Sequence, residues 1–153
     1  MDELKRIDDQ LRRGFEGHAW HGPSLRELLA DVTAEQATAR PVPGAHSIWE
    51  ITLHIAAWHE GVRRRVEGER VELSPEEDWP PVASTSEVAW QDALAVLERT
   101  HTELRRTVSR LADARLQEMV VGKDHSVYVM LHGLIQHDLY HAGQIALLKK
   151  AWS

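Results

Sequence analysis

The segment Ser47-Ile48-Trp49-Glu50-Ile51-Thr52-Leu53-His54-Ile55-Ala56-Ala57-Trp58 carries the clearest helix-start signal in the chain. Ser47 and Glu50 have the S-x-x-E spacing of a capping box, in which each side chain bonds the free backbone N–H of the other residue. After this box, apolar residues recur at steps of three or four, at Ile51, Ile55, Trp58 and Val62. That period predicts an amphipathic helix from Ser47 to near Gly68.

Three further segments have the same helical period, over residues 2–17, 84–111 and 126–151. Ser84 and Glu87 form a second S-x-x-E pair, which predicts where the helix of residues 84–111 begins. Ser24 and Glu27 form another such pair and predict a shorter helix. No segment shows the sustained alternation of a half-buried strand, so the sequence predicts an all-α fold.

Four amphipathic helices bury their apolar stripes most simply as a four-helix bundle. Residues 69–83 contain Pro75, Pro80 and Pro81 and are expected to connect the second and third long helices. When extended, this connection spans about 50 Å, which exceeds the roughly 30 Å length of a 20-residue helix. It can therefore cross the bundle. Residues 33–46 are predicted to be a second connection with one helical turn.

The chain has 153 residues, a formal net charge of -6 and no cysteine. This length fits a single domain, which we expect to cover residues 1–153. The negative charge argues against nucleic-acid and anionic-membrane partners. The charged start Met1-Asp2-Glu3-Leu4-Lys5-Arg6 and the lack of a run of about 18 apolar residues predict a cytoplasmic protein. Without cysteine, any thiol chemistry requires an imported thiol.

Three histidines are candidates for metal ligands. His137 and His141 lie four residues apart, so one helical turn places both imidazoles on the same face. His54 follows Ile51 by three residues and borders the apolar stripe of its own helix. Three neutral imidazoles suit Zn, Ni, Fe or Mn, and they leave coordination positions open, as in catalytic sites. The alternative is that these are hydrogen-bonded core histidines, because H-x-x-x-H also arises by chance.

Other residues near these stripes have competing interpretations. His18 and His101 continue apolar stripes and are expected to point inward as core histidines or as hydrogen-bond partners of ligands. Asp138 is placed to accept the free ring N–H of a ligating histidine, and the alternative is a helix-flank charge paired with solvent or a neighbouring residue. Trp79, beside two prolines, is a candidate for covering a pocket mouth. His21 lies three residues after His18 in a stretch rich in glycine, so these two are expected to line a pocket at best. The remaining histidines have only loop or helix-flank positions: His46, His59, His125 and His132.

Residues 47–58, quoted above, and the downstream segment Gln136-His137-Asp138-Leu139-Tyr140-His141-Ala142-Gly143-Gln144-Ile145 together resemble the DinB and YfiT-like family. The stretch Ala19-Trp20-His21-Gly22-Pro23-Ser24-Leu25 adds to the likeness, which covers most of the chain. The resemblance implies an up-down-down-up four-helix bundle, often a homodimer. It also implies a divalent metal bound by His54, His137 and His141.

The resemblance implies an activity as well, because the family includes bacillithiol S-transferases and mycothiol-dependent maleylpyruvate isomerases. The first hypothesis is therefore a metal-dependent S-transferase that activates a low-molecular-weight thiol, such as bacillithiol, toward a small-molecule substrate. The second is a hydrolase that uses metal-bound water as its nucleophile. The third is a non-catalytic binding module that the metal stabilises.

Overall fold

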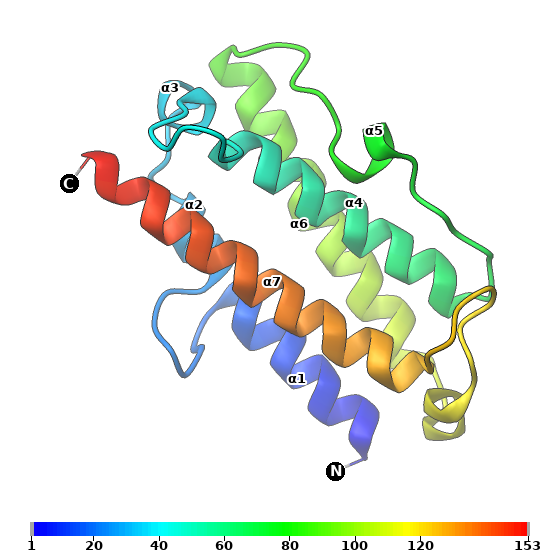
Figure 1. Cartoon of the computed structure of the whole chain (residues 1–153). Helices are drawn as coiled ribbons and strands as arrows, with labels where there is room; N and C mark the ends of the chain where they lie inside the picture. Colours follow the sequence, from blue (N-terminus) through cyan, green and yellow to red (C-terminus); the bar gives the residue numbers. More distant parts are fainter. Residues whose placement is uncertain (1, 153) are drawn as a thin grey trace.

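The computed structural model describes residues 2–152, and this part of the chain is all-helical, as predicted (Figure 1). Four helices are long: α1 (Glu3–Glu16), α4 (Ile48–Val66), α6 (Glu87–Ser109) and α7 (Val127–Lys149). The shorter elements are α2 (Leu25–Leu29), α3 (Ala34–Thr38), α5 (Pro75–Asp78) and the 3-10 turns η1 (Asp113–Gln117) and η2 (Lys150–Trp152). Within residues 2–152 no strand forms, although one isolated bridge joins Met119 and Ser126.

The four long helices lie side by side. α4 packs against α6 and α7, and α1 packs against the same two helices, so the four contacts close a ring around the core (Figure 1). Phe15, Ile55 and Trp90 are buried in one of the two apolar clusters of this core, and Leu104 and Leu131 are buried in the other. Each such side chain contributes about 1.5–3 kcal/mol when it leaves water, so the predicted stripes hold the helices together.

The helix starts confirm two of the three predicted capping boxes. Both boxes, Ser24 with Glu27 and Ser47 with Glu50, form with both of their hydrogen bonds. The predicted box of Ser84 and Glu87 is wrong, because Ser86 caps α6 and accepts a hydrogen bond from the backbone N–H of Ala89. The Glu87 carboxylate instead accepts the backbone N–H of Ala34 at the start of α3, at 3.0 Å. The carboxylate predicted to cap the start of α6 thus accepts a free backbone N–H at the start of α3 instead.

One of the two predicted connections matches the sequence, and the other contains a helix that was not expected. α3 supplies the single turn expected in residues 33–46. α5 was not predicted: it lies within residues 69–83 and begins with a capping box of Ser74 and Glu77, with Pro75 in its first turn. α5 packs against α4 and brings Asp78 beside that helix. It therefore matters for the site described below.

The last helix also ends differently from the prediction. Ser126 caps α7 as expected, but the α-helix stops at Lys149 and continues to Trp152 as a 3-10 turn. None of the helices described, α7 included, combines the length and apolar character that a membrane crossing requires.

Candidate metal centre

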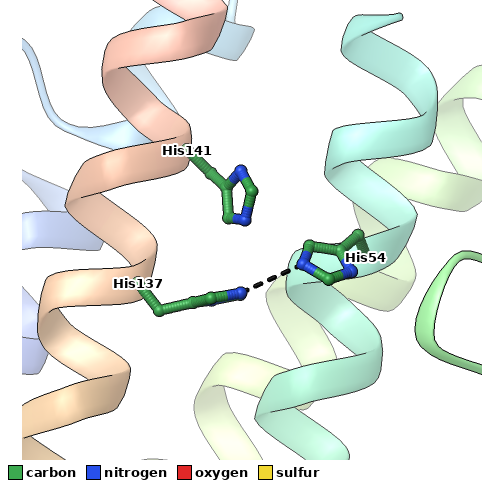
Figure 2. A group of neighbouring side chains, drawn as sticks. All are labelled: His54, His137 and His141. Carbon is green, nitrogen blue, oxygen red and sulfur yellow. Dashed lines mark hydrogen bonds between the residues drawn. The ribbon is translucent and has the colours of Figure 1, made fainter. Parts of the chain in front are cut away.

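The structure brings together the three histidines that the sequence singled out (Figure 2). His54 projects from α4, and His137 and His141 project from α7, the helix packed against it. Each offers a ring nitrogen, and these nitrogens lie within 4.8 Å of one another. The Nε2 atoms of His54 and His137 are 3.0 Å apart. This is less than twice the metal–nitrogen distance of about 2.1 Å, so one ion can reach both.

Hydrogen bonds to the opposite ring nitrogen orient two of the imidazoles. Nδ1 of His54 donates to the backbone carbonyl of Asp78 at 2.6 Å and also lies 3.1 Å from its Oδ1. Nδ1 of His141 donates to Oε1 of Gln144 at 2.7 Å. In a neutral imidazole the second nitrogen is then an acceptor, so each Nε2 lone pair faces the cluster and is available to a metal.

His137 is held less firmly. Its side chain is 26% exposed, whereas His54 and His141 are each 5% exposed as whole residues. Its Nδ1 is buried without a hydrogen-bond partner among the described residues, and the Oδ1 of Asp138 is 3.9 Å away. A buried polar atom without a partner is unfavourable, so the His137 ring gains stability if it rotates toward an acceptor or if a water molecule bonds its Nδ1.

Burial keeps two of the three imidazoles, those of His54 and His141, uncharged. It lowers the pKa of His54, and the neighbouring charge of His137 acts in the same direction, although hydrogen bonding to Asp78 opposes both effects. Burial likewise lowers the pKa of His141, to about 4, although the hydrogen bond that its Nδ1 donates to Gln144 acts in the opposite direction. Because a metal competes with protons for the same lone pair, neutral imidazoles at pH 7 are ready to bind one.

Asp138 is buried, as predicted, but its hydrogen bond goes to a different histidine. Oδ2 of Asp138 lies 2.8 Å from Nε2 of His59, which is completely buried. Burial raises the pKa of the Asp138 carboxyl, but the charges of His59 and His137 and the hydrogen bond from His59 outweigh it, and the pKa falls to about 2. The carboxylate thus remains ionised beside the histidine cluster.

An indole covers one side of the site. The ring of Trp79 stacks on His54, with 3.8 Å between centroids and 6° between planes. His46 stacks against Trp79 as well, at 3.6 Å and 9°. Trp79 therefore covers a site histidine, in keeping with the covering role expected of it.

Of the two other histidines expected to point inward, one is buried and one is exposed. His101 points inward as expected: it is buried, stacks on Phe15 at 3.8 Å and bonds Glu16. His18 is exposed, so its predicted inward position is wrong. The reason is local: α1 ends at Glu16, Gly17 has φ 154°, and His18 itself has φ 63°, which turns the chain away from the core.

Sequence reasoning missed His59, Asp78 and His46. The signal for His59 was present, because it lies four residues after Ile55 and three before Val62 on the buried stripe. Asp78 could have been found through the Ser74–Glu77 capping box, which places a helical turn there. No sequence signal brings His46 to Trp79, since that contact depends on how the two loops fold together.

The fold and the cluster define a class: an all-helical protein whose interior presents three imidazoles that could hold a metal ion. The model of the DinB superfamily matches residues 19–145, and the chain belongs to that superfamily. Neither a curated protein nor a solved structure gave a significant match.

Proposed function

We propose that this protein is a metal-dependent enzyme that uses His54, His137 and His141 to hold one divalent transition metal ion. The proposed reaction is transfer of a low-molecular-weight thiol to a small electrophile. The observation that carries the proposal is the convergence of three ring nitrogens within 4.8 Å from two packed helices. The donor set fits Zn, Ni, Fe or Mn, since all three ligands are imidazoles.

The chain's own residues provide three functions in this proposal. Asp78 and Gln144 orient two imidazoles through their Nδ1 atoms, so that little rearrangement is needed for binding. Trp79 shields one face of His54 from water. His137, whose side chain is 26% exposed, leaves an approach for a small molecule.

A bound divalent metal would supply Lewis acidity, which lowers the pKa of a ligating thiol or water. Because the chain contains no cysteine, a thiol nucleophile has to come from a separate molecule. Membership of the DinB superfamily and three ligands with open coordination positions support this reaction. We further propose that the four long helices form the up-down-down-up bundle expected of the family, which the side-by-side packing in Figure 1 supports.

The decisive experiment incubates metal-loaded protein with a panel of small electrophiles, with and without bacillithiol or a related thiol. The transferase proposal expects product only when the thiol is present. Turnover without thiol that disappears in His54→Ala would select the hydrolase instead. Failure of every substrate, with full metal occupancy, would favour a binding module.

A spectroscopic measurement separates thiol binding from substrate choice. Cobalt-substituted protein should develop a sulfur-to-metal charge-transfer band when a small thiol is added. His137→Ala protein should lose this band, whereas His18→Ala, a change at an exposed histidine, should retain it. A cobalt spectrum that millimolar thiol leaves unchanged would contradict the transferase proposal.

A further inference from the structure

A groove of about 410 Å³ opens next to the histidine cluster, between α4, α7 and the loop before α7. Its lining includes Trp58 and His137 at the cluster, and the rings of these two residues are 5.7 Å apart. Val62 and Leu134 form apolar walls, and Arg65 and Lys123 also line the groove. One cavity therefore contains both a site histidine and two cationic side chains.

Arg65 is a buried cation. The residue is 7% exposed, and its Nε and Nη2 donate hydrogen bonds to the backbone carbonyl of Val71 at 3.2 and 2.9 Å. Its guanidinium lies over the ring of Trp58, 5.3 Å from the centroid. Among residues 2–152, no carboxylate forms an ion pair with it. A buried charge without a counter-ion is unfavourable unless something supplies one.

The nearby carboxylate is committed elsewhere. Glu72 forms its ion pair with Lys123, at 2.8 Å, and the Glu72 side chain is 62% exposed. Burial lowers the pKa of Arg65, and the charge of Glu72 only partly opposes this effect. The groove lining thus includes two cations and no carboxylate, so it has a surplus of positive charge, which the Glu72 carboxylate offsets only at Lys123.

The spacing along the helices sets the length of a ligand. α4 and α7 run in opposite directions (Figure 1). The groove therefore extends from Trp58 to Arg65 along α4 and, on the facing helix, from His137 back to Met130 along α7. Seven helical residues advance roughly 10 Å. An extended chain covers about 3.5 Å in three bonds, so a ligand of about nine or ten chain atoms, the carboxylate oxygen included, reaches from the cations to the cluster.

We infer that this groove binds a small amphipathic substrate by its carboxylate, which Arg65 and Lys123 receive, while its apolar chain lies between Val62 and Leu134. The other end of the molecule then reaches His137. The inference rests on the proposed metal-dependent function only for the reaction of the substrate at the histidines. Binding of the carboxylate depends on the groove alone.

A larger cavity, of about 790 Å³, lies on another side of α7 and is a poorer candidate. None of the three site histidines lines it, and its Lys149 already pairs with Asp31 at 2.6 Å. It supplies a matched control, because Gly143 lines the larger cavity and Gly133 lines the groove. A Cβ added at either glycine meets no atom within 4 Å. Leucine at either position should therefore leave α7 intact and fill only the cavity that it faces.

The test measures binding of octanoate, octan-1-ol and octylammonium to the full-length protein by isothermal titration calorimetry. The metal is first removed by dialysis against a chelator, so that the carboxylate cannot bind to it. At about pH 8 free imidazoles are uncharged and do not attract the carboxylate. Octanoate should bind at least about tenfold more tightly than the alcohol, since a charge-assisted hydrogen bond distinguishes them, and octylammonium should bind most weakly.

Variants then locate the binding. Gly133→Leu should abolish octanoate binding, and Gly143→Leu should bind it as the wild type does. Lys123→Gln should remove much of the preference for octanoate over octanol, whereas Arg70→Gln, which removes an exposed cation from the same region, should not. Arg65→Gln should act as Lys123→Gln does, provided that its circular dichroism matches the wild type.

Equal affinity for octanoate and octanol, or undiminished octanoate binding in Gly133→Leu, would overturn the inference. Elemental analysis of the wild-type protein tests the proposed function separately. Full metal occupancy without carboxylate preference would refute the groove alone. Carboxylate preference without metal binding would refute the metal-dependent enzyme and leave the groove standing.

Discussion

Nε2 of His59 lies 2.8 Å from Oδ2 of Asp138, and both side chains are buried where α4 and α7 meet. The pair adjoins the candidate metal centre, because Asp138 follows His137 in the chain and its Oδ1 lies 3.9 Å from Nδ1 of His137. Nδ1 of His59 and Oδ1 of Asp138 have no hydrogen-bond partner among the described residues. Each member of this pair therefore depends on the other for its one strong polar contact.

Removing either partner should cost stability. Asp138→Ala leaves His59 buried without an acceptor, and we expect a loss of about 3 kcal/mol in the free energy of unfolding. Urea denaturation of Asp138→Ala, His59→Leu and the double variant measures the coupling between them. A coupling of about 1–3 kcal/mol is expected, because the two side chains are in direct contact. Strictly additive single losses would mean that the pair contributes nothing beyond its packing.

His101 should make stability depend on pH. Burial, helped by the charge of His59, lowers its pKa in the folded protein to about 4 from an ordinary value of 6.5, despite the hydrogen bond to Glu16. Between these values the unfolded chain binds the proton and the folded chain does not. Stability is therefore lost as pH falls from 6.5 toward 4, by up to about 3 kcal/mol for this residue.

The measurement is the free energy of unfolding by urea at intervals across that pH range. His101→Gln should flatten the dependence, because the group that titrates is gone. The matched control is His18→Gln, which changes an exposed histidine and should retain the wild-type slope. An unchanged slope in His101→Gln would show that other groups, such as His141, account for the whole effect.

The sequence predicted the features of this structure that depend on residues a few positions apart, and it did not predict those that depend on long-range packing. The capping box at Ser47 and the apolar period after it fix α4, since both act between residues a few positions apart. The i, i+4 spacing placed His137 and His141 on one face for the same reason. The position of Asp78 against His54 depends on α5 folding back over α4, a long-range packing that no local pattern encodes. Glu87 shows the same limit, because its carboxylate bonds α3 instead of its own helix start.

Single substitutions should test each proposed metal ligand. His54→Ala, His137→Ala and His141→Ala should each lose most of the metal on dialysis against a weak chelator, because each removes one of three ligands. Elemental analysis gives the occupancy. His18→Ala is the control for an exposed histidine. Loss of an orienting partner, as in Gln144→Ala, should weaken binding by only about 10–100-fold. Full occupancy in either α7 variant would remove that histidine from the site.

Metal retention should persist to lower pH than free imidazoles would allow. Protonation competes with the metal, and the pKa of His54 is lowered while that of His141 falls to about 4. Protons therefore compete with the metal at His54 only below the ordinary histidine value near 6.5, and at His141 only near pH 4. Occupancy measured after equilibration at stepped pH should therefore fall at a pH below 6.5. Loss already centred on pH 6.5 would show that the ligands titrate as exposed histidines do.

Trp79 should control how fast the metal leaves. Its indole stacks on His54 at 3.8 Å, but the carbonyl of Asp78 holds the same imidazole independently. Trp79→Ala should therefore leave the wild-type amount of metal bound without chelator, and it should speed transfer of the metal to a chromogenic chelator. A stacking contact of about 0.5–1.5 kcal/mol corresponds to roughly two- to tenfold in rate.

Trp79→Phe, which retains an aromatic ring, should release the metal at a rate between those of the wild type and Trp79→Ala. Trp20→Ala is the control, because Trp20 is 101% exposed. If Trp79→Ala releases metal at the wild-type rate, the indole does not shield the site, and the exposed edge of His137 would be the route by which the metal exchanges.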